Sequence, residues 1–401
     1  MMTAIKVAKH VRVEDGIERY LALFGIAAGA RARAYHETYP EYAPTELVRL
    51  DHLADHLGIE RFWVKDESSR FGLDAFKVLG GTYCIGSLLM RKMGCEGEEM
   101  TFDRVSSEDA RRALGEVVFA TTTDGNHGRG IAWTAARLGY RSIIRMPKGT
   151  RPERLENIRK LGADASITDL NYDETSFALR GLAQERGWML VQDSAWEGYE
   201  EVPTQIMQGY LTMGVEILEQ LGGERPTHVF LQAGVGSMAA ALAAFFRDAF
   251  RDDPPFTVIV EPDRADCLYQ TARAADGELH VVGGALDSMM AGLACGVPSM
   301  LAWEVLERCA DAFVSMPDWV AANGMRVLGA PLLGDRRVIS GESGAATSGL
   351  VASALATEGL REVAEQLHLD AGSRVLCIST EGATDTENYR RVVWEGLCPM
   401  P

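Results

Sequence analysis

Short runs of apolar residues alternate with longer amphipathic stretches along most of the chain. Apolar runs bounded by turn residues are typical of buried strands, whereas apolar residues spaced three or four apart indicate helices. The predicted strands span residues 61–64, 117–121, 141–146, 165–168, 189–191, 228–232, 257–260 and 375–379. The predicted helices include residues 128–138, 152–161, 172–185, 204–220 and 238–248. This alternation predicts an α/β fold with mostly parallel sheets and crossover helices.

A polar and charged stretch, residues 94–112, interrupts this alternation. Such a stretch predicts a surface excursion that leads into a second lobe. We expect a small domain at residues 96–191 and a discontinuous large domain at residues 1–95 and 192–401. The expected architecture therefore has two lobes, each a mostly parallel sheet flanked by helices.

The composition is consistent with this globular architecture, and the net charge disfavours two classes of binding partner. The 401 residues are 47% apolar and 24% charged, which is typical of globular proteins. The net charge of −17 disfavours binding to nucleic acid or to an anionic membrane. No signal peptide is evident near the N-terminus, and the longest apolar run, residues 238–246, is too short to span a bilayer. We therefore expect a cytoplasmic protein.

The seven cysteines are too scattered for a disulfide framework, and none of them forms a C-x-x-C metal-binding pair. We therefore expect no metal site and mostly buried thiols. Cys267 and Cys295 both fall in predicted connecting segments, and whether they pair is left open.

The most informative lysine is Lys77, which follows Ala75 and Phe76 and precedes the apolar, glycine-containing stretch 78–81. This context predicts a lysine at the start of a packed helix rather than on a solvated face. A buried amine is costly to keep charged, so its pKa falls and it becomes a nucleophile that can form a Schiff base with an aldehyde. The alternative is a structural lysine whose stem covers apolar surface.

A glycine-rich turn follows the predicted strand 228–232, where the chain reads Gly234-Val235-Gly236-Ser237-Met238. The glycines let the backbone approach an anion, and N–H groups at the start of the next helix can bind phosphate. The third glycine of a dinucleotide site and the Gly-Lys-Ser/Thr of a P-loop are both missing, so a single phosphate fits best. A tight packing corner is the alternative.

A second strand-to-helix turn, residues 121–130, gathers hydroxyl, carboxylate and amide groups. The hydroxyls of Thr121, Thr122 and Thr123, with nearby backbone N–H groups, suit a carboxylate. Asn126 offers an amide donor to a phenolate oxygen. Helix capping explains one or two of these residues but not the whole run.

Two further strands end in polar residues. Asp193 follows the strand 189–191 and precedes Trp196 and Tyr199, as at the edge of a pocket. Ser379 and Thr380 end the strand 375–379. Each of these segments can equally be an ordinary loop at the end of a strand.

Taken in order, these motifs resemble the fold type II pyridoxal-phosphate enzymes, the group of the tryptophan synthase β-subunit and threonine dehydratase. The similarity extends from about residue 49 to residue 394. Within the group, the runs 66–73, 121–130, 192–198, 289–296 and 392–396 resemble the diaminopropionate ammonia-lyase family. Asp124 departs from the wider group, which has a small neutral residue there. Ala75 stands where many relatives have Ser.

The resemblance implies a role for each motif. Lys77 is implied to bind pyridoxal phosphate covalently and Asn126 to bond the ring oxygen. Ser379, or otherwise Thr380, is implied to meet the pyridine nitrogen. The residues implied to wrap the phosphate are Gly234, Val235, Gly236, Ser237 and Met238. The residues implied to hold the substrate carboxylate are Thr121, Thr122 and Thr123.

The resemblance further implies a homodimeric lyase that converts 2,3-diaminopropionate to pyruvate and two ammonia molecules. Asp124 and Asp193 are the implied catalytic carboxylates, because a carboxylate can pair with a second ammonium group and can act as a base. With Lys77 on one face of the cofactor and an aspartate on the other, we expect both D and L isomers to react. Which aspartate serves which isomer is left open.

Three other functions are alternatives. They are a serine/threonine dehydratase, a cysteine synthase-like β-replacement transferase, and an amino-acid sensor without chemistry. A serine hydroxyl would leave a site carboxylate desolvated and unpaired, which favours a diamine by roughly 1–3 kcal/mol. The retention of Lys77 together with every cofactor motif argues against a sensor.

Overall fold

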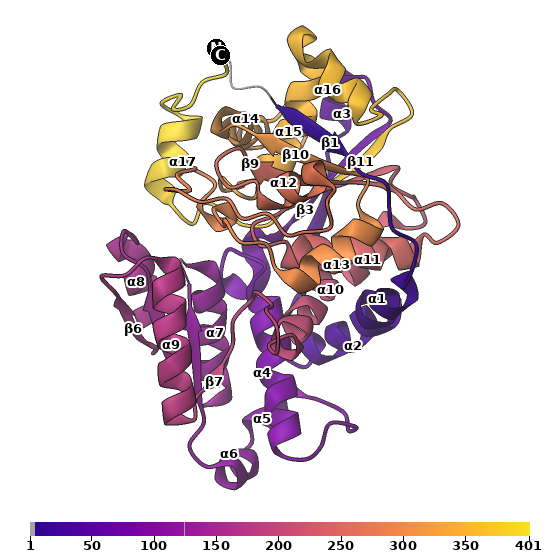
Figure 1. Ribbon diagram of the computed structural model, residues 1–401. Coiled ribbons are helices and arrows are strands. Elements are labelled where there is room, and N and C mark those ends of the chain that lie inside the picture. Colours follow the sequence, from indigo (N-terminus) through magenta and orange to yellow (C-terminus); the bar gives the residue numbers. More distant parts are fainter. Residues whose placement is uncertain (1–4, 124) are drawn as a thin grey trace. The chain divides into compact units, whose positions relative to one another are not determined.

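The computed structural model describes residues 5–123 and 125–401, and two compact units can be distinguished in it (Figure 1). The larger unit comprises residues 5–27, Pro44–Ala75 and Met213–Pro401, and the smaller unit comprises Ala28–Ala43 and Phe76–Thr212. The domain boundaries expected from the sequence, a small domain at residues 96–191 and a large domain on both sides of it, stay a prediction.

The larger unit is built on a seven-stranded sheet in the order β1-β10-β9-β8-β11-β3-β2. The strands are β1 (Lys6–Lys9), β10 (Ala312–Met316), β9 (Phe256–Pro262), β8 (His228–Gln232), β11 (Arg374–Ser379), β3 (Arg61–Asp66) and β2 (Glu46–Arg49). The five inner strands pair in parallel, whereas the edge strands β1 and β2 pair antiparallel. Because the carboxyl ends of parallel strands share one edge of a sheet, the turns after β8 and β11 lie at the same edge.

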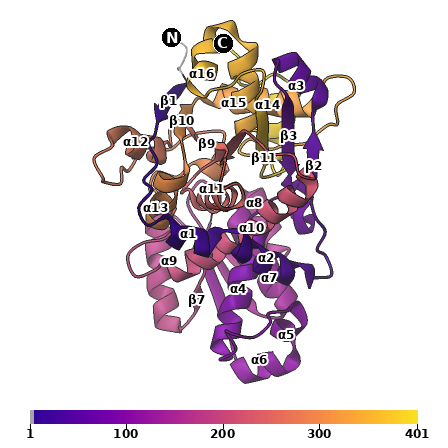
Figure 2. The ribbon, with the colours of Figure 1, turned by 90° about the vertical axis from the view of Figure 1, so that its right-hand side faces the viewer.

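Helices cover both faces of this sheet (Figure 2). On one face, Phe230 and Val260 share a buried cluster with α14 (Asp318–Gly329) and α15 (Ala346–Ala356). On the other face, α11 (Ser237–Ala249) packs against β8 and against α13 (Met300–Cys309). The other helices of this unit are α1 (Ile17–Phe24), α3 (Asp51–Leu57), α12 (Cys267–Ala274), α16 (Arg361–Gln366), α17 (Thr386–Val393) and the short 3-10 helices η1 (Glu67–Gly72), η2 (Ala291–Leu293) and η3 (Glu358–Leu360).

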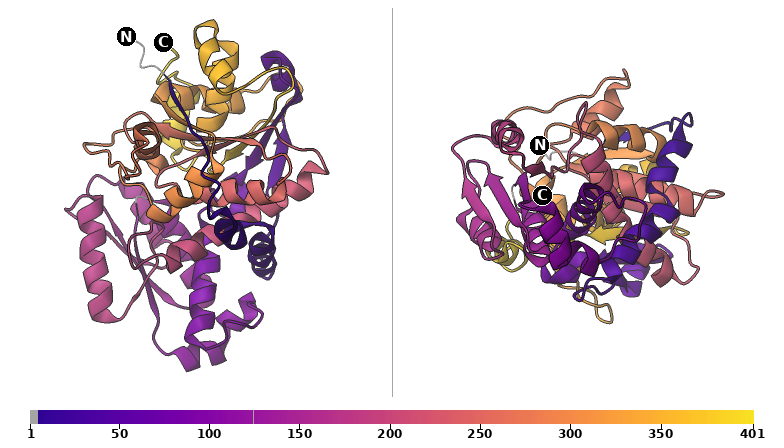
Figure 3. Two further views of the ribbon diagram at one scale, coloured as in Figure 1. Left: turned by 45° about the vertical axis from the view of Figure 1, so that its right-hand side comes forward. Right: turned by 90° about the horizontal axis from the view of Figure 1, so that it is seen from below.

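The smaller unit is built on a four-stranded, all-parallel sheet (Figure 3). Its strands, in spatial order, are β6 (Asp164–Ile167), β5 (Arg141–Met146), β4 (Val118–Thr122) and β7 (Met189–Leu190). Its helices are α4 (Val78–Lys92), α5 (Phe102–Ser106), α6 (Glu108–Leu114), α7 (Asn126–Leu138), α8 (Pro152–Arg159) and α9 (Tyr172–Arg186). Two helices, α2 (Ile26–Glu37) and α10 (Glu201–Leu221), contain a unit boundary.

Alternate residues of the small sheet meet different helices. Leu179 and Ala183 of α9 share a buried cluster with Val118 and Ala120 of β4. Gly128 of α7 lies against Ile144, where an added Cβ would come within 3.0 Å of the isoleucine side chain. This two-sided burial explains why β4 is apolar at successive positions rather than at every second one.

All eight predicted strands and all five predicted helices are present, with ends that differ by a few residues. The pattern missed β1, β2 and β10. Strands β1 and β2 are four residues long, lie at sheet edges and carry charged residues, so their apolar signal is weak. The polar stretch 94–112 was expected to be a surface excursion, but it contains α5 and most of α6.

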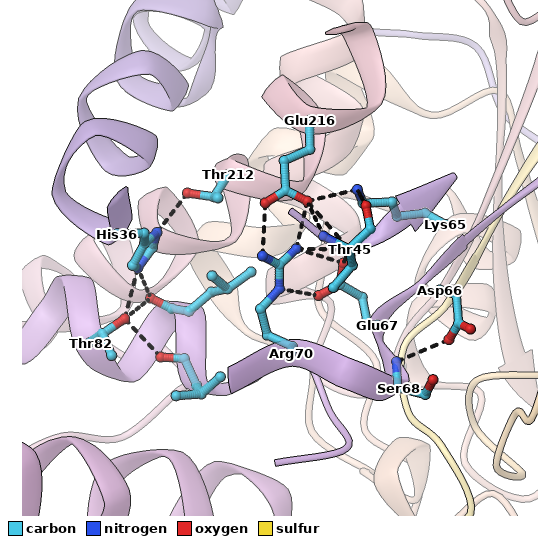
Figure 4. Close-up of polar contacts among 12 residues, drawn as sticks. His36, Thr45, Lys65, Asp66, Glu67, Ser68, Arg70, Thr82, Thr212 and Glu216 are labelled. Atoms are coloured by element: carbon cyan, nitrogen blue, oxygen red, sulfur yellow. Dashed lines mark hydrogen bonds and ion pairs between the residues drawn. The ribbon is translucent and has the colours of Figure 1, made fainter. Parts of the chain in front are cut away.

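A fully buried ionic network lies in the larger unit (Figure 4). Arg70 donates through three nitrogens to the carboxylates of Glu67 and Glu216, and Lys65 forms an ion pair with Glu216 at 2.7 Å. All four side chains are 0% exposed. Burial opposes the charge on Glu216, but the bonds from Arg70 outweigh it and keep the pKa of Glu216 below its usual value.

Candidate active site

Lys77 is the N-cap residue of α4, in the smaller unit, as its sequence context predicted. The first turn of α4 packs closely against two other helices at glycines. A Cβ at Gly130 of α7 would come within 2.9 Å of the Val78 Cα, and a Cβ at Gly209 of α10 would collide with the Leu79 carbonyl oxygen. These two close approaches fix the backbone beside Lys77.

The Lys77 amine forms an ion pair with Asp193. Its Nζ lies 2.7 Å from Asp193 Oδ2, and the two side chains are 24% and 10% exposed. Burial opposes the charge on Asp193, but Lys77 and then His127 outweigh burial and hold the pKa of this carboxyl well below its usual range. Lys77 is therefore partly exposed and paired with an ionised carboxylate, not enclosed in the apolar setting that the sequence suggested.

The three threonines at the end of β4 are all buried. The Thr121 hydroxyl donates to the side-chain oxygen of Gln192 at 3.0 Å, and the Thr123 hydroxyl accepts from two backbone N–H groups of the following turn. Within the part of the chain that the structure describes, the buried Thr122 hydroxyl has no hydrogen-bond partner. Thr122 therefore has the hydroxyl best suited to an incoming carboxylate, although this role stays a prediction for all three residues.

Two more residues of this turn were expected to act directly. Asp124 lies outside the described residues. Asn126 is the first residue of α7 and is half-buried, so it stands where a helix N-terminus favours negative charge. Its bond to the oxygen of a cofactor ring stays a prediction.

Three neighbours of Asp193 were not predicted as site residues. His127 Nε2 donates to the Val191 carbonyl at 2.8 Å, which places Nδ1 3.8 Å from Asp193 Oδ2. The Gln192 side chain bonds the backbone N–H and carbonyl of Thr122 at the end of β4. The Tyr199 hydroxyl bonds the backbone on both sides of Val191. The available signal was a Gln-Asp pair directly after a strand, with a tyrosine soon after it.

The glycine-rich turn in the larger unit connects β8 to α11. Gly236 is the N-cap of α11 with φ +100°, a conformation that disfavours other residues. A Cβ at Gly234 would come within 3.3 Å of neighbouring atoms. The Val235 carbonyl accepts a hydrogen bond at 3.0 Å from the backbone N–H of Ser299, the N-cap of α13. Ser237 and Met238 begin α11, and the first N–H groups of a helix have no acceptor within it.

Ser379 and Thr380, at the end of β11, are buried and hydrogen-bonded differently. The Ser379 hydroxyl donates to Ser340 at 2.8 Å, whereas the Thr380 hydroxyl accepts from Gln232 at 3.0 Å. Thr380 therefore keeps its own proton for an outside acceptor. Which of the two meets a ring nitrogen stays open.

The chain that leads to Lys77 is hydrogen-bonded to the turn after β11. Gly382 N–H donates to the Asp74 carbonyl at 2.9 Å, and Ala75 pairs with Glu381 in an antiparallel bridge. Asp74 has φ +53°, a conformation uncommon outside glycine. The turn that contains Thr380 thus constrains the backbone two residues before Lys77.

Several other features of the described residues bear on the site. They contain no cluster of three or more His, Cys, Asp or Glu side chains that could hold a metal ion. Cys267 and Cys295, whose pairing was left open, do not form a disulfide with each other. No helix in the described part of the chain is long and apolar enough to cross a membrane.

Each unit contains residues that suit one part of an aldehyde that carries a phosphate group. In the smaller unit, Lys77 is a positioned and partly exposed amine. In the larger unit, Gly236 is the N-cap of α11, and the first N–H groups of that helix can bind an anion.

Known proteins of similar sequence and structure cover nearly the whole chain. The family described as pyridoxal-phosphate dependent enzyme matches residues 38–381. Diaminopropionate ammonia-lyase of Escherichia coli K12 is 48% identical over 377 residues, 93% of each chain, and that of Salmonella typhimurium is 44% identical over 389 residues, 96% of each. The solved Escherichia coli enzyme in complex with an aminoacrylate-PLP azomethine reaction intermediate matches with a TM-score of 0.88 at 44% identity, over 98% of each chain. The predicted fold is confirmed.

Proposed function

Since this chain belongs to the pyridoxal-phosphate dependent enzymes, and among them to the diaminopropionate ammonia-lyase family, we propose that it eliminates both amino groups of 2,3-diaminopropionate. One water is consumed, and pyruvate and two ammonia molecules are formed. The observation that carries the proposal is the Lys77–Asp193 pair, in which an amine and an ionised carboxylate share one 2.7 Å bond.

The cofactor contacts follow from the two sets of residues. Bound pyridoxal phosphate supplies an electron sink for the charge left at the substrate Cα. Lys77 provides the primary amine that holds the cofactor aldehyde. The turn from Gly234 to Met238 holds the phosphate through backbone N–H groups, and Asn126 bonds the ring oxygen. Ser379 or Thr380 meets the ring nitrogen, and the free proton of Thr380 supports the second choice.

The amine and the carboxylate have different roles in the proton transfer. Lys77, once neutral, takes the proton from the substrate Cα. Asp193 stays ionised at neutral pH and therefore compensates the positive charge that Lys77 gains. Thr122, with its buried hydroxyl, holds the substrate carboxylate beside this pair.

The second amine of the substrate is recognised by carboxylate. Asp124 and Asp193 would pair with the β-ammonium group, and an aspartate on the face opposite Lys77 would let both D and L isomers react. Replacing each aspartate singly by Asn and assaying both enantiomers tests this assignment. We expect each variant to lose one isomer more than the other, and unchanged rates with both isomers in both variants would refute it.

Serine is the substrate that separates this proposal from a dehydratase. It has the same carbon skeleton, and the Escherichia coli relative has been solved in complex with D-serine. We expect kcat/KM for diaminopropionate to exceed that for serine by roughly 10- to 100-fold, because a hydroxyl leaves the carboxylate unpaired. Equal values would favour a dehydratase, and consumption of added sulfide without net ammonia release would favour a β-replacement transferase.

The assembly and location follow from the family and the charge. We propose a homodimer that acts in the cytoplasm without nucleic-acid or membrane partners, in line with the net charge of −17. Analytical ultracentrifugation tests the assembly, with twice the 43.7 kDa chain mass expected. A species at the mass of one chain would refute the dimer.

A further inference from the structure

The Tyr199 hydroxyl lies at the outer edge of the small sheet and bonds the backbone of the residues that directly precede Asp193. Strand β7 is the outermost strand on its side, so the backbone groups on its outer edge have no neighbouring strand. Tyr199 supplies both missing partners with one atom. Its hydroxyl donates to the Leu190 carbonyl at 2.9 Å and accepts from the Gln192 N–H at 2.9 Å.

The inner edge of the same segment is bonded as well. Val191 N–H donates to the Ala120 carbonyl at 2.8 Å, and the Val191 carbonyl accepts from His127 Nε2 at 2.8 Å. The backbone from the Leu190 carbonyl to the Gln192 N–H is therefore fully hydrogen-bonded. Asp193 is the next residue, and its carboxylate meets the Lys77 amine.

The Tyr199 ring is itself held in place by a tight turn. Tyr199 N–H donates to the Trp196 carbonyl at 2.8 Å, and Gly198 between them has φ +80°. The Trp196 and Tyr199 rings stack at 4.1 Å and 9°, and the Arg180 guanidinium lies 5.0 Å from the Trp196 ring. Burial raises the pKa of Tyr199, so the hydroxyl keeps the proton that it donates to Leu190.

From this geometry we infer that Tyr199 is a positioning residue for Asp193, acting through the backbone of residues 190–192. The hydroxyl joins the two ends of the loop 190–199 by hydrogen bonds. These bonds fix the backbone from which the Asp193 side chain extends. Small displacements of a reacting group cost large factors in rate, so the hydroxyl contributes to turnover without touching the substrate. The inference rests on the proposed role of Asp193.

A double-mutant cycle in the holoenzyme tests this inference. Tyr199→Phe removes the hydroxyl and keeps the ring stack, and we expect kcat to fall roughly tenfold with KM little changed. In an Asp193→Asn background the same change should have no further effect on kcat, because the group that it positions is already lost. Tyr140→Phe is the matched control, since its hydroxyl also bonds a backbone carbonyl of the smaller unit, at 3.4 Å.

Two readouts do not depend on turnover. Tyr199→Phe should speed amide hydrogen exchange in residues 189–193, and it should shift the pH dependence of the visible absorbance of the bound cofactor. Tyr140→Phe should do neither. If Tyr199→Phe folds poorly, Trp196→Phe weakens the stack while keeping the hydroxyl, and it should give a smaller loss of kcat that again vanishes in the Asp193→Asn background.

Several outcomes would overturn the inference. One is the same fold loss of kcat in both backgrounds, which would mean that Tyr199 acts independently of Asp193. Another is unchanged kcat, exchange and absorbance in Tyr199→Phe. If Asp193→Asn alone leaves kcat unchanged, the proposed role of Asp193 fails first and this inference with it. If diaminopropionate is not a substrate of the unaltered enzyme, the proposed function itself fails.

Discussion

Two groups of charged residues in this chain differ in how far they are exposed to solvent. The Arg70 network in the larger unit is 0% exposed, and Arg70 bonds both of its carboxylate partners through several nitrogens. The Lys77–Asp193 pair in the smaller unit is 24% and 10% exposed and shares one bond at 2.7 Å. The first arrangement is closed to solvent, whereas the second is partly accessible to it.

The difference shows why a perturbed pKa does not by itself identify a catalytic group. In both regions a cation outweighs burial and lowers the pKa of a carboxyl, Glu216 in one and Asp193 in the other. The exposure of the side chains separates the two. We infer that the Arg70 network stabilises the fold and that the Lys77 pair performs chemistry, and the following predictions test that division.

The largest expected effect is on activity, from the loss of Lys77. Lys77→Ala should lower kcat by on the order of 10³-fold or more, because one change removes both the cofactor attachment and the proton acceptor. The free energy of unfolding of the apoprotein should change by only about 1 kcal/mol, since the side chain is partly exposed. Pyruvate formation and urea unfolding measure the two quantities, and residual activity above a tenth would contradict the assignment.

Loss of Arg70 should give the opposite result. Arg70→Met leaves Glu67 and Glu216 buried with less compensation, so the free energy of unfolding should fall by about 3–5 kcal/mol. Arg49→Met is the control, because the Arg49–Asp51 pair is about half exposed and should contribute less than about 1 kcal/mol. Equal losses from the two changes in urea unfolding would show that the buried network does not stabilise the fold.

Asp193→Asn sharpens the comparison, since it removes charge without changing size. We expect kcat to fall by roughly 100-fold, while the free energy of unfolding falls by only about 1–2 kcal/mol. Asp164→Asn, which alters the more exposed Arg145–Asp164 pair, should change neither quantity. A large loss of stability with little loss of kcat would place Asp193 with the structural charges instead.

Glu342 provides a third case, a buried carboxyl with an amide partner, Asn388, and no ion pair among the described residues. Burial, and then the charge of Glu381, raise the pKa of Glu342 to about 7. A raised pKa means that Glu342 contributes stability below its unfolded value of 4.5, and that this contribution is lost as the pH rises towards about 7.

Glu342→Gln should therefore flatten the dependence of stability on pH. Relative to the unaltered protein, the variant should gain about 1–3 kcal/mol on going from pH 5 to pH 8. Urea unfolding at the two pH values measures the gain. Exposed Glu362→Gln is the control and should show none. An unchanged slope in Glu342→Gln would mean that Glu342 is ionised throughout.

The sequence predicted the elements, and it singled out Lys77 as the candidate lysine, because both have local signals. The inner strands are apolar runs, and Lys77 lies three residues before the first glycine of α4. The edge strands β1 and β2 were missed because each has only four residues, two of them charged, and so gives a weak apolar signal.

The residues that set up the site depend on long-range contacts, which no single sequence displays. Gln192 bonds β4 from 70 positions away, and His127 reaches Val191 from 64. Asp193 was proposed as a site residue because an acid follows a strand, but its partner Lys77 lies 116 positions earlier. The hydrogen bond from the Thr121 hydroxyl to the side chain of Gln192 could not be predicted from the sequence either. The three threonines therefore looked equivalent in sequence.

The proposed chemistry is tested most directly by the ammonia released per pyruvate from purified enzyme and 2,3-diaminopropionate. The account predicts a ratio of about two, with either enantiomer, because both amines leave. The Lys77→Ala variant under the same conditions should form neither product. A ratio of about one would contradict the proposal, because pyruvate contains no nitrogen and one amine would then have been transferred to an acceptor instead of being released.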